Sequence, residues 1–265
     1  MRQIRTSHAL TIARPDRDEV ARVGLAELAE LDTLLGSLDA GDWYRPTASG
    51  WTVHEMVAHV VGQHAETARP WTIAGRVRAA RRRFPSMSAL DAHNALQVAA
   101  FGPQSGPELR ARLARVGQRA VRMRRRTPSF VRRQRTERTF PGERLVEPEL
   151  AYVLDVLSNR DIWMHWLEIA RATGREFAVG AHDRLVVAQV MRDLAMGWTG
   201  PPLVLELTGP AGGTWQVGDG EPVASARAGT LDCLWQLSGR PGSPVPQVSG
   251  DPAAAGALRA ARVVF

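Results

Sequence analysis

The chain has 265 residues, 44% of them hydrophobic and 23% charged, which allows one large soluble domain or two modest ones. No apolar run approaches the ~20 residues that span a bilayer, and the N-terminus lacks the apolar core of a secretory signal. A single cysteine, Cys233, excludes an internal disulfide and fits a reducing cytosol. We therefore expect a cytoplasmic protein without a membrane-spanning part, in which Cys233 is a small core residue and not a reactive thiol.

The net charge is +7, and every basic side chain is an arginine. Many arginines fall into two runs, namely Arg76, Arg78, Arg81, Arg82 and Arg83, and then Arg122, Arg124, Arg125, Arg126, Arg132, Arg133, Arg135 and Arg138. Such runs can bind phosphates or attract an anionic small molecule, but they are more often a solvated helix face. Few aromatic residues alternate with these arginines and no nucleic-acid-binding motif accompanies them. We expect both runs to face solvent, and we do not expect nucleic acid as a partner.

Four segments of the N-terminal half have the apolar periodicity of helices. They span residues 16–38, 51–70, 89–100 and 107–126. The second has Ser49 and Thr52 as candidate caps. Residues 132–147 are irregular, and the loop ending in Pro141-Gly142 is a candidate for the entrance of a site, since such loops often carry function.

A long helix follows, with Pro148 as its first residue and Gly174 at its end. Its core stripe is expected to consist of Leu150, Val153, Leu154, Leu157 and Met164. Asp161 and His165 fall on or beside this stripe and, being four residues apart, share one helix face. A carboxylate among leucines is costly unless it is paired or bound to a metal. The two residues therefore indicate either a buried Asp–His pair between helices or a functional site.

The second helix contains His54, His59 and His64. Five residues turn a helix by about 140°, so the three side chains cannot all point inward. On a helical wheel His59 lies at the edge of the apolar stripe and His54 lies off it, whereas His64 lies in the middle of Val53, Met56, Val57 and Val60. Periodicity thus favours His64, with His59 second. A lone inward histidine is more often a core residue, but together with Asp161 and His165 it would complete the ligand set of a catalytic divalent-metal site.

The composition changes at Gly200, which two prolines follow. A helix at 182–198 is expected to close the first domain, so we place the domain boundary between residues 199 and 200. Beyond it, strands are expected at 203–209, 214–218 and 222–229, then a helix that Thr230 caps and Gly239 ends, a further strand, and a short helix at 251–261. This pattern predicts a small α/β domain.

Three motifs occur in order along the chain: Trp51-Thr52-Val53, then Ala58-His59-Val60-Val61-Gly62, and then Arg160-Asp161 through Met164-His165 to Ala170-Arg171-Ala172-Thr173-Gly174-Arg175. They resemble the mycothiol-dependent maleylpyruvate isomerase family, which belongs to the DinB-like metal-binding four-helix bundles. The resemblance covers most of the chain. It implies a mainly α fold, with a DinB-like four-helix bundle at 1–199 and a small C-terminal sterol-carrier-like α/β domain at 200–265.

In that family the histidine of the second of these motifs and the acidic–histidine pair of the third bind a divalent metal. The resemblance therefore implies His59, Asp161 and His165 as ligands, with Zn²⁺ as the expected ion, and it selects His59 over His64. Trp166 and Glu168 stand where such proteins often have a basic residue and an aspartate. Glu168 can still accept a hydrogen bond from a liganding imidazole and orient it, which makes it the candidate catalytic-site carboxylate.

The resemblance implies an enzyme with mycothiol, a low-molecular-weight thiol, as co-substrate. Metal coordination deprotonates a thiol, and the thiolate can add to an electrophilic carbon, then leave in an isomerase or stay in an S-transferase. Arg227 and Arg240 are candidate ligands for an anionic or electrophilic small substrate, and we expect a monomer or a homodimer. Two alternatives stay open, namely a non-catalytic regulator or binding module and a metal-dependent hydrolase that activates water.

Overall fold

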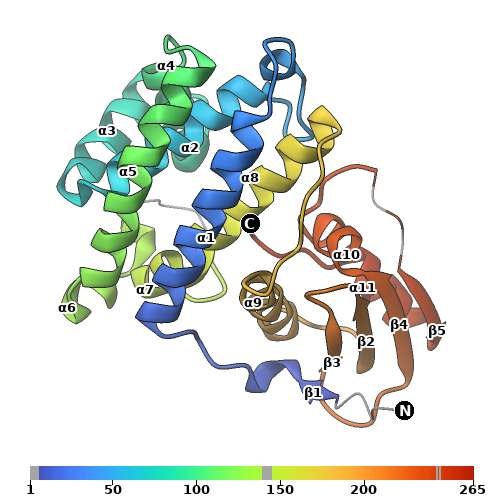
Figure 1. Cartoon of the computed structure of the whole chain (residues 1–265). Coiled ribbons are helices and arrows are strands. Elements are labelled where there is room, and N and C mark those ends of the chain that lie inside the picture. The colour runs from blue at the N-terminus through green and yellow to red at the C-terminus, as the bar shows by residue number, and fades with distance from the viewer. Residues whose placement is uncertain (1–5, 139–144, 243, 245) are drawn as a thin grey trace. The chain divides into compact units, whose positions relative to one another are not determined.

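A computed structural model describes residues 6–138, 145–242, 244 and 246–265 (Figure 1). Contacts divide the chain into a helical unit, residues 16–177, and a second unit that joins residues 1–15 to residues 178–265 and contains a sheet. The expected fold class, a helical bundle with a small C-terminal α/β part, is confirmed. The expected entrance loop at Pro141-Gly142 lies outside the described residues.

The helical unit contains the four helices expected in the N-terminal half. They are α1 (Arg17–Gly36), α2 (Val53–Thr67), α4 (Ala89–Phe101) and α5 (Gly106–Arg126). Of the two candidate caps of α2, Thr52 is the one used, because its hydroxyl and the carboxylate of Glu55 each bond to the other residue's backbone N–H. The unit also contains α3 (Ile73–Arg83) and α6 (Ser129–Arg132). The helix α3 is not among the predicted ones, because only Val77 and Ala80 of it are buried and arginines fill much of the rest.

The predicted long helix is interrupted near its start. A short α7 (Leu150–Tyr152) leads into a π-helical turn, Val153–Leu157, before α8 (Ser158–Thr173). Pro148 is not the first helical residue, because Glu149 caps α7. Gly174 ends α8 as predicted, with a left-handed φ of 67° that favours glycine.

The π turn also corrects the predicted core stripe. One extra residue in a turn rotates the preceding face by about 100° relative to a regular helix. The buried residues of the turn are Asp155 and Val156, whereas four residues of the predicted stripe are only half-buried, namely Leu150, Val153, Leu154 and Leu157. Met164 is buried as predicted, and all residues from Ile162 to Ala170 are buried, so neighbouring segments surround α8 on every side.

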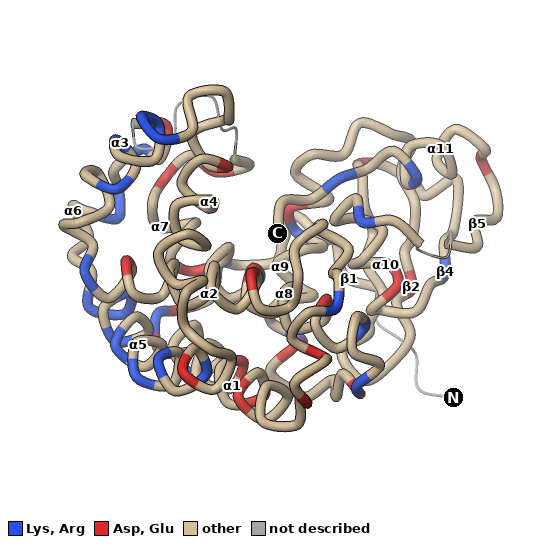
Figure 2. Tube along the Cα trace, turned by 90° about the horizontal axis from the view of Figure 1, so that it is seen from above, with Lys and Arg blue, Asp and Glu red and all other residues tan. Residues whose placement is uncertain are grey.

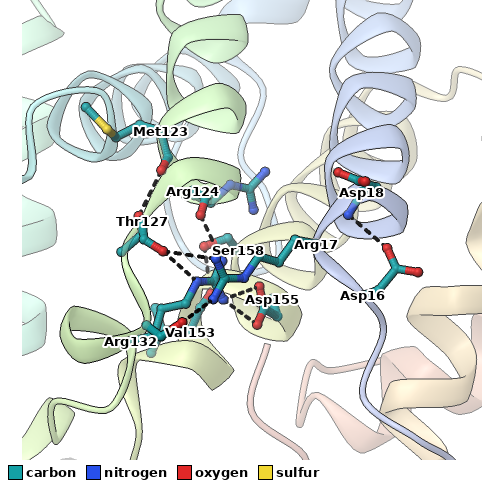
Figure 3. A network of polar contacts seen from close by, with 11 residues as sticks. Asp16, Arg17, Asp18, Met123, Arg124, Thr127, Arg132, Val153, Asp155 and Ser158 are labelled. Carbon is teal, nitrogen blue, oxygen red and sulfur yellow. Dashed lines mark hydrogen bonds and ion pairs between the residues drawn. The ribbon is translucent and has the colours of Figure 1, made fainter.

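Most arginines of the two runs face solvent as expected, and Figure 2 shows them along α3, α5 and α6. Arg124 and Arg132 are exceptions, since both are buried. Arg132 donates from Nη1 to both oxygens of Asp155, at 2.7 and 2.6 Å, and from Nη2 to the Arg124 carbonyl (Figure 3). Arg124 donates to Oδ1 of Asn159 at 2.8 Å. These contacts join the end of α5 and α6 to the π turn and to α8.

The second unit is built on a mixed sheet. In the described part of the chain its strand order is β1-β3-β2-β4-β5, with β1–β3 and β2–β4 parallel and the other pairs antiparallel. Its elements are β1 (Ser7–His8), α9 (Asp183–Met196), β2 (Leu203–Thr208), β3 (Gly213–Val217), β4 (Ala224–Gly229), α10 (Thr230–Leu237), β5 (Gln247–Gly250) and α11 (Pro252–Ala260). Leu203, Leu205 and Leu207 alternate with half-buried residues along β2, so one face of this strand enters a core.

One detail of this unit differs from the predictions. Thr230 is the first residue of α10 and Gly229 is its cap, because the Thr230 hydroxyl instead donates to the Thr208 carbonyl at 2.9 Å. Contacts group α9 with the sheet and not with the bundle. The domain boundary between residues 199 and 200 stays a prediction. Cys233 is fully buried, as a core residue should be, and burial raises the pKa of its thiol to about 12.

None of the helices among the described residues combines the length and apolar character that crossing a membrane requires.

Candidate metal centre

The three predicted metal ligands come together inside the helical unit. His59 lies on α2, and Asp161 and His165 lie one turn apart on α8. One potential ligand atom from each lies within 4.8 Å of the other two. His165 Nε2 and Asp161 Oδ1 are 3.4 Å apart, which is roughly the separation of two ligands about 2.1 Å from one tetrahedral zinc ion.

The surroundings of the three residues are mostly closed. His59 and His165 are buried, and their rings meet nearly edge to face with centroids 5.2 Å apart. Trp51, just before α2, lies against the His59 ring, with the two ring centroids 5.1 Å apart. The Asp161 side chain is 19% exposed, so the group can be reached from the Asp161 side.

The charges of this group follow from burial and from the mutual contacts. Burial is the main cause that lowers the pKa of His59 to about 4, so this ring is neutral at pH 7. Burial opposes the charge on His165 too, but Asp161 and Glu168 outweigh it and raise its pKa to about 9. The pKa of Asp161 is lowered despite burial, by His165, by His59 and by the Gln63 amide, which donates to Oδ2 at 2.9 Å. Without a metal the group is thus an ionised carboxylate, an imidazolium and a neutral imidazole.

Glu168, the predicted orienting carboxylate, lies on α8 one turn after His165. Nδ1 of His165 donates to Glu168 Oε2 at 3.2 Å, and the Ser49 hydroxyl donates to Oε1 at 2.5 Å. With Nδ1 engaged in this way, Nε2 of His165 faces Asp161. Glu168 therefore has the position and the chemistry expected of a residue that orients a liganding imidazole.

The other histidines of α2 lie elsewhere. His64, which the helical wheel favours, is buried, but Nδ1 donates to the Val60 carbonyl of its own helix at 2.9 Å and it is not part of the group. Burial and the nearby Arg124 lower its pKa to about 4. His54 is half-buried and contacts the Gln104 carbonyl at 2.8 Å. The wheel alone does not separate His59 from His64, because α2 packs on α4, α5 and α8 and is therefore buried on more than one face.

A second polar cluster adjoins the group and is not among the predicted sites. Glu66 of α2 contacts Nε2 of His93 at 2.8 Å, accepts from Nε2 of Gln97 at 2.7 Å and pairs with Arg76. Glu66, His93 and Gln97 are all buried. Of this cluster, the spacing along the sequence indicates Glu66, because it follows His59 by seven residues and shares its helix face.

The two predicted substrate ligands belong to the second unit. Arg227 on β4 is exposed, and its Nε lies 3.5 Å from Oε1 of Glu206, the residue that pairs with it on the neighbouring strand β2. Arg240 follows α10 and lies over the Trp235 ring, with its guanidinium carbon 5.9 Å from the centroid. Their role toward a substrate stays a prediction.

Comparisons with known proteins bear on the family and on the fold. The family described as mycothiol maleylpyruvate isomerase N-terminal domain matches residues 25–170, more than half of the chain. A crystal structure of the mycothiol-dependent maleylpyruvate isomerase is similar with a TM-score of 0.58 and 16% identity, and that of a histidine-to-alanine mutant with 0.59 and 15%. Each alignment covers 93% of this chain and 97% of the other, and at this identity it shows the fold alone. A comparison with curated proteins finds no match.

Proposed function

Since the chain belongs to the family of the mycothiol maleylpyruvate isomerase N-terminal domain, we propose that it is a divalent-metal enzyme that uses mycothiol on a small electrophilic substrate. The observation that carries the proposal is the convergence of His59, Asp161 and His165 within 4.8 Å inside a mostly closed part of the bundle. We propose Zn²⁺ as the ion, and an isomerase or an S-transferase as the class of enzyme.

The residues present fit such an ion. Two imidazoles and one carboxylate are the donors that zinc accepts, and three protein ligands leave a tetrahedral ion one open position, as in catalytic and not in structural sites. The ionised Asp161 supplies a negative charge, and the neutral His59 offers a lone pair at pH 7 without losing a proton first. Without a metal, burying the polar rings of His59 and His165 costs free energy that apolar side chains would not cost.

Each residue then has a distinct task. Asp161 is held in place by the Gln63 amide and stays ionised. His165 must give up its proton when a cation arrives, and Glu168 keeps the remaining N–H on Nδ1, so the lone pair of Nε2 points toward Asp161. Trp51 packs against the His59 ring.

A divalent metal held by these residues would lower the pKa of a thiol that it binds and make the thiolate available at neutral pH. The thiolate of mycothiol forms a C–S bond to an electrophilic carbon of the substrate. In an isomerase this addition would turn a cis double bond into a single bond, with the π electron pair moved onto the activating group of the substrate; after rotation the pair would return and expel the thiolate. In an S-transferase the adduct would instead take up a proton and keep the C–S bond. Arg227 and Arg240 are proposed to hold an anionic substrate, and the protein is proposed to act in the cytoplasm as a monomer or a homodimer.

Metal analysis of the purified protein tests the proposal. We expect one divalent ion per chain, and we expect His59→Ala or His165→Ala to abolish it while the fold remains. His64→Ala should keep the ion, and His54→Ala should be nearly silent. Loss of the ion in His64→Ala but not in His59→Ala would show that the helical wheel identified the correct ligand.

Thermal unfolding with and without mycothiol then separates the alternatives. A metal-loaded protein that mycothiol stabilises in a saturable manner supports the thiol enzyme. A metal-loaded protein that mycothiol does not stabilise favours the hydrolase. Wild-type protein that carries no metal and cannot be loaded contradicts the enzyme and favours a non-catalytic binding module.

A further inference from the structure

We infer that Gln97 and Glu66 form a hydrogen-bonded chain that orients His59, as Glu168 orients His165. The inference rests on the proposed metal site and names the residues that position one of its ligands. It starts from the second polar cluster, where a glutamine lies between a buried carboxylate and the face of α2 that carries His59.

The packing of α2 on α4 brings Gln97 to this face. His59, Gly62 and Glu66 follow one another at spacings of three and four residues, so they share one face of α2. Gln97 from α4 fills the space left by the missing side chain of Gly62. A Cβ atom added to Gly62 would lie 2.6 Å from Cβ and 2.9 Å from Cγ of Gln97. The Gln97 side chain therefore passes over the turn that separates His59 from Glu66.

The contact with Glu66 fixes the orientation of the Gln97 amide. Nε2 donates to Glu66 Oε2 at 2.7 Å, and an ionised carboxylate can only accept. Glu66 stays ionised, because His93, Gln97 and Arg76 outweigh the opposing effect of burial and lower its pKa. The amide nitrogen must therefore face Glu66, which leaves Oε1 of Gln97 as an acceptor on the other side.

Two complementary atoms remain. Within the described residues, Oε1 of Gln97 and Nδ1 of His59 are both buried and have no hydrogen-bond partner. A buried polar atom without a partner costs about 1–3 kcal/mol. Gln97 is also one of the groups that raise the pKa of His59 against the larger effect of burial, which agrees with proximity of the two side chains. A hydrogen bond from His59 Nδ1 to Gln97 Oε1 satisfies both atoms.

This bond has a chemical consequence for the proposed site. A proton on Nδ1 leaves the lone pair on Nε2 of the neutral ring. The two imidazoles are then supported differently, since His165 faces the carboxylate of Glu168 directly and His59 reaches that of Glu66 through an amide. Removing such a supporting residue weakens metal affinity by about 10- to 100-fold in known sites.

The tautomer of His59 tests the inference without any metal. Long-range ¹H–¹⁵N NMR of the metal-free protein should show the neutral His59 ring protonated on Nδ1. Gln97→Met keeps the volume but removes both polar atoms, so Nε2 protonation should become substantial. Gln118→Met, the same substitution at an exposed position of α5, should change nothing. A wild-type ring protonated on Nε2, or the same tautomer in wild type and Gln97→Met, overturns the inference.

Cobalt titration gives a second readout. The dissociation constant for Co²⁺ should rise about 10- to 100-fold in Gln97→Met and stay unchanged in Gln118→Met. Gly62→Ala, which forces Gln97 away through its new Cβ, should weaken binding in the same direction. If wild type binds Co²⁺ and Gln97→Met and Gly62→Ala bind it as tightly as wild type, the inference is wrong while the proposed function survives. If wild type binds no Co²⁺, the proposed function fails, and the tautomer measurement still decides the inference.

Discussion

Replacing Asp155 by alanine should destabilise the protein far more than removing an exposed carboxylate. Asp155 is buried in the π turn and receives both hydrogen bonds of Nη1 of the buried Arg132. The Asp155 carboxylate also favours the charged form of Arg124. Burial and the neighbouring charge of Arg132 oppose it and lower the pKa of Arg124 to about 10. The Asp155→Ala variant leaves two buried guanidinium groups without this partner (Figure 3).

The expected loss follows from the burial of the pair. Breaking a buried ion pair by removing one partner costs roughly 3–5 kcal/mol, because the other charge stays buried and uncompensated. The exposed pair Arg135–Glu137, at 3.2 Å, provides the matched control, and Glu137→Ala should cost less than about 1 kcal/mol.

Urea unfolding followed by circular dichroism measures both free energies of unfolding. The double variant Arg132→Met with Asp155→Leu removes both members of the pair and should regain much of the stability that Asp155→Ala loses. A loss below about 1 kcal/mol in Asp155→Ala, or no recovery in the double variant, would show that this buried ion pair does not stabilise the fold as proposed.

Three further predictions concern chemistry. Asp161 and Glu168 raise the pKa of His165 to about 9 against the effect of burial, so a metal must displace the proton of this ring. Metal affinity should therefore increase as the pH rises toward 9, and calorimetry in two buffers should detect about one proton released at pH 7. A constant affinity between pH 6.5 and 8.5 would contradict this charge state. Cys233→Ala should lower stability by roughly 1 kcal/mol and keep thiol-dependent activity, whereas a folded but inactive variant would rule out an external thiol as the nucleophile. The exposed arginines of α3 and α5 should bind DNA only weakly and in a salt-sensitive manner, and submicromolar, sequence-dependent binding at about 150 mM salt would favour a regulator.

Local spacing along the chain was sufficient for several parts of this structure. The apolar periodicity predicted α1, α2, α4 and α5, because a helix face is defined by residues three and four apart. The same rule placed Asp161 and His165 on one face of α8, and the order of the motifs identified the family. The choice of His59 came from that resemblance and not from periodicity.

Which helix faces are covered, and by which residues, depends on how the helices pack together. Both His59 and His64 are buried, but only His59 meets Asp161 and His165, since that depends on where α8 crosses α2. The Gln63–Asp161 contact joins residues 98 positions apart. The burial of Arg124 and Arg132 depends on α6 turning back onto the π turn. A spacing rule describes one helix at a time, whereas these contacts arise where several helices exclude water from the same volume.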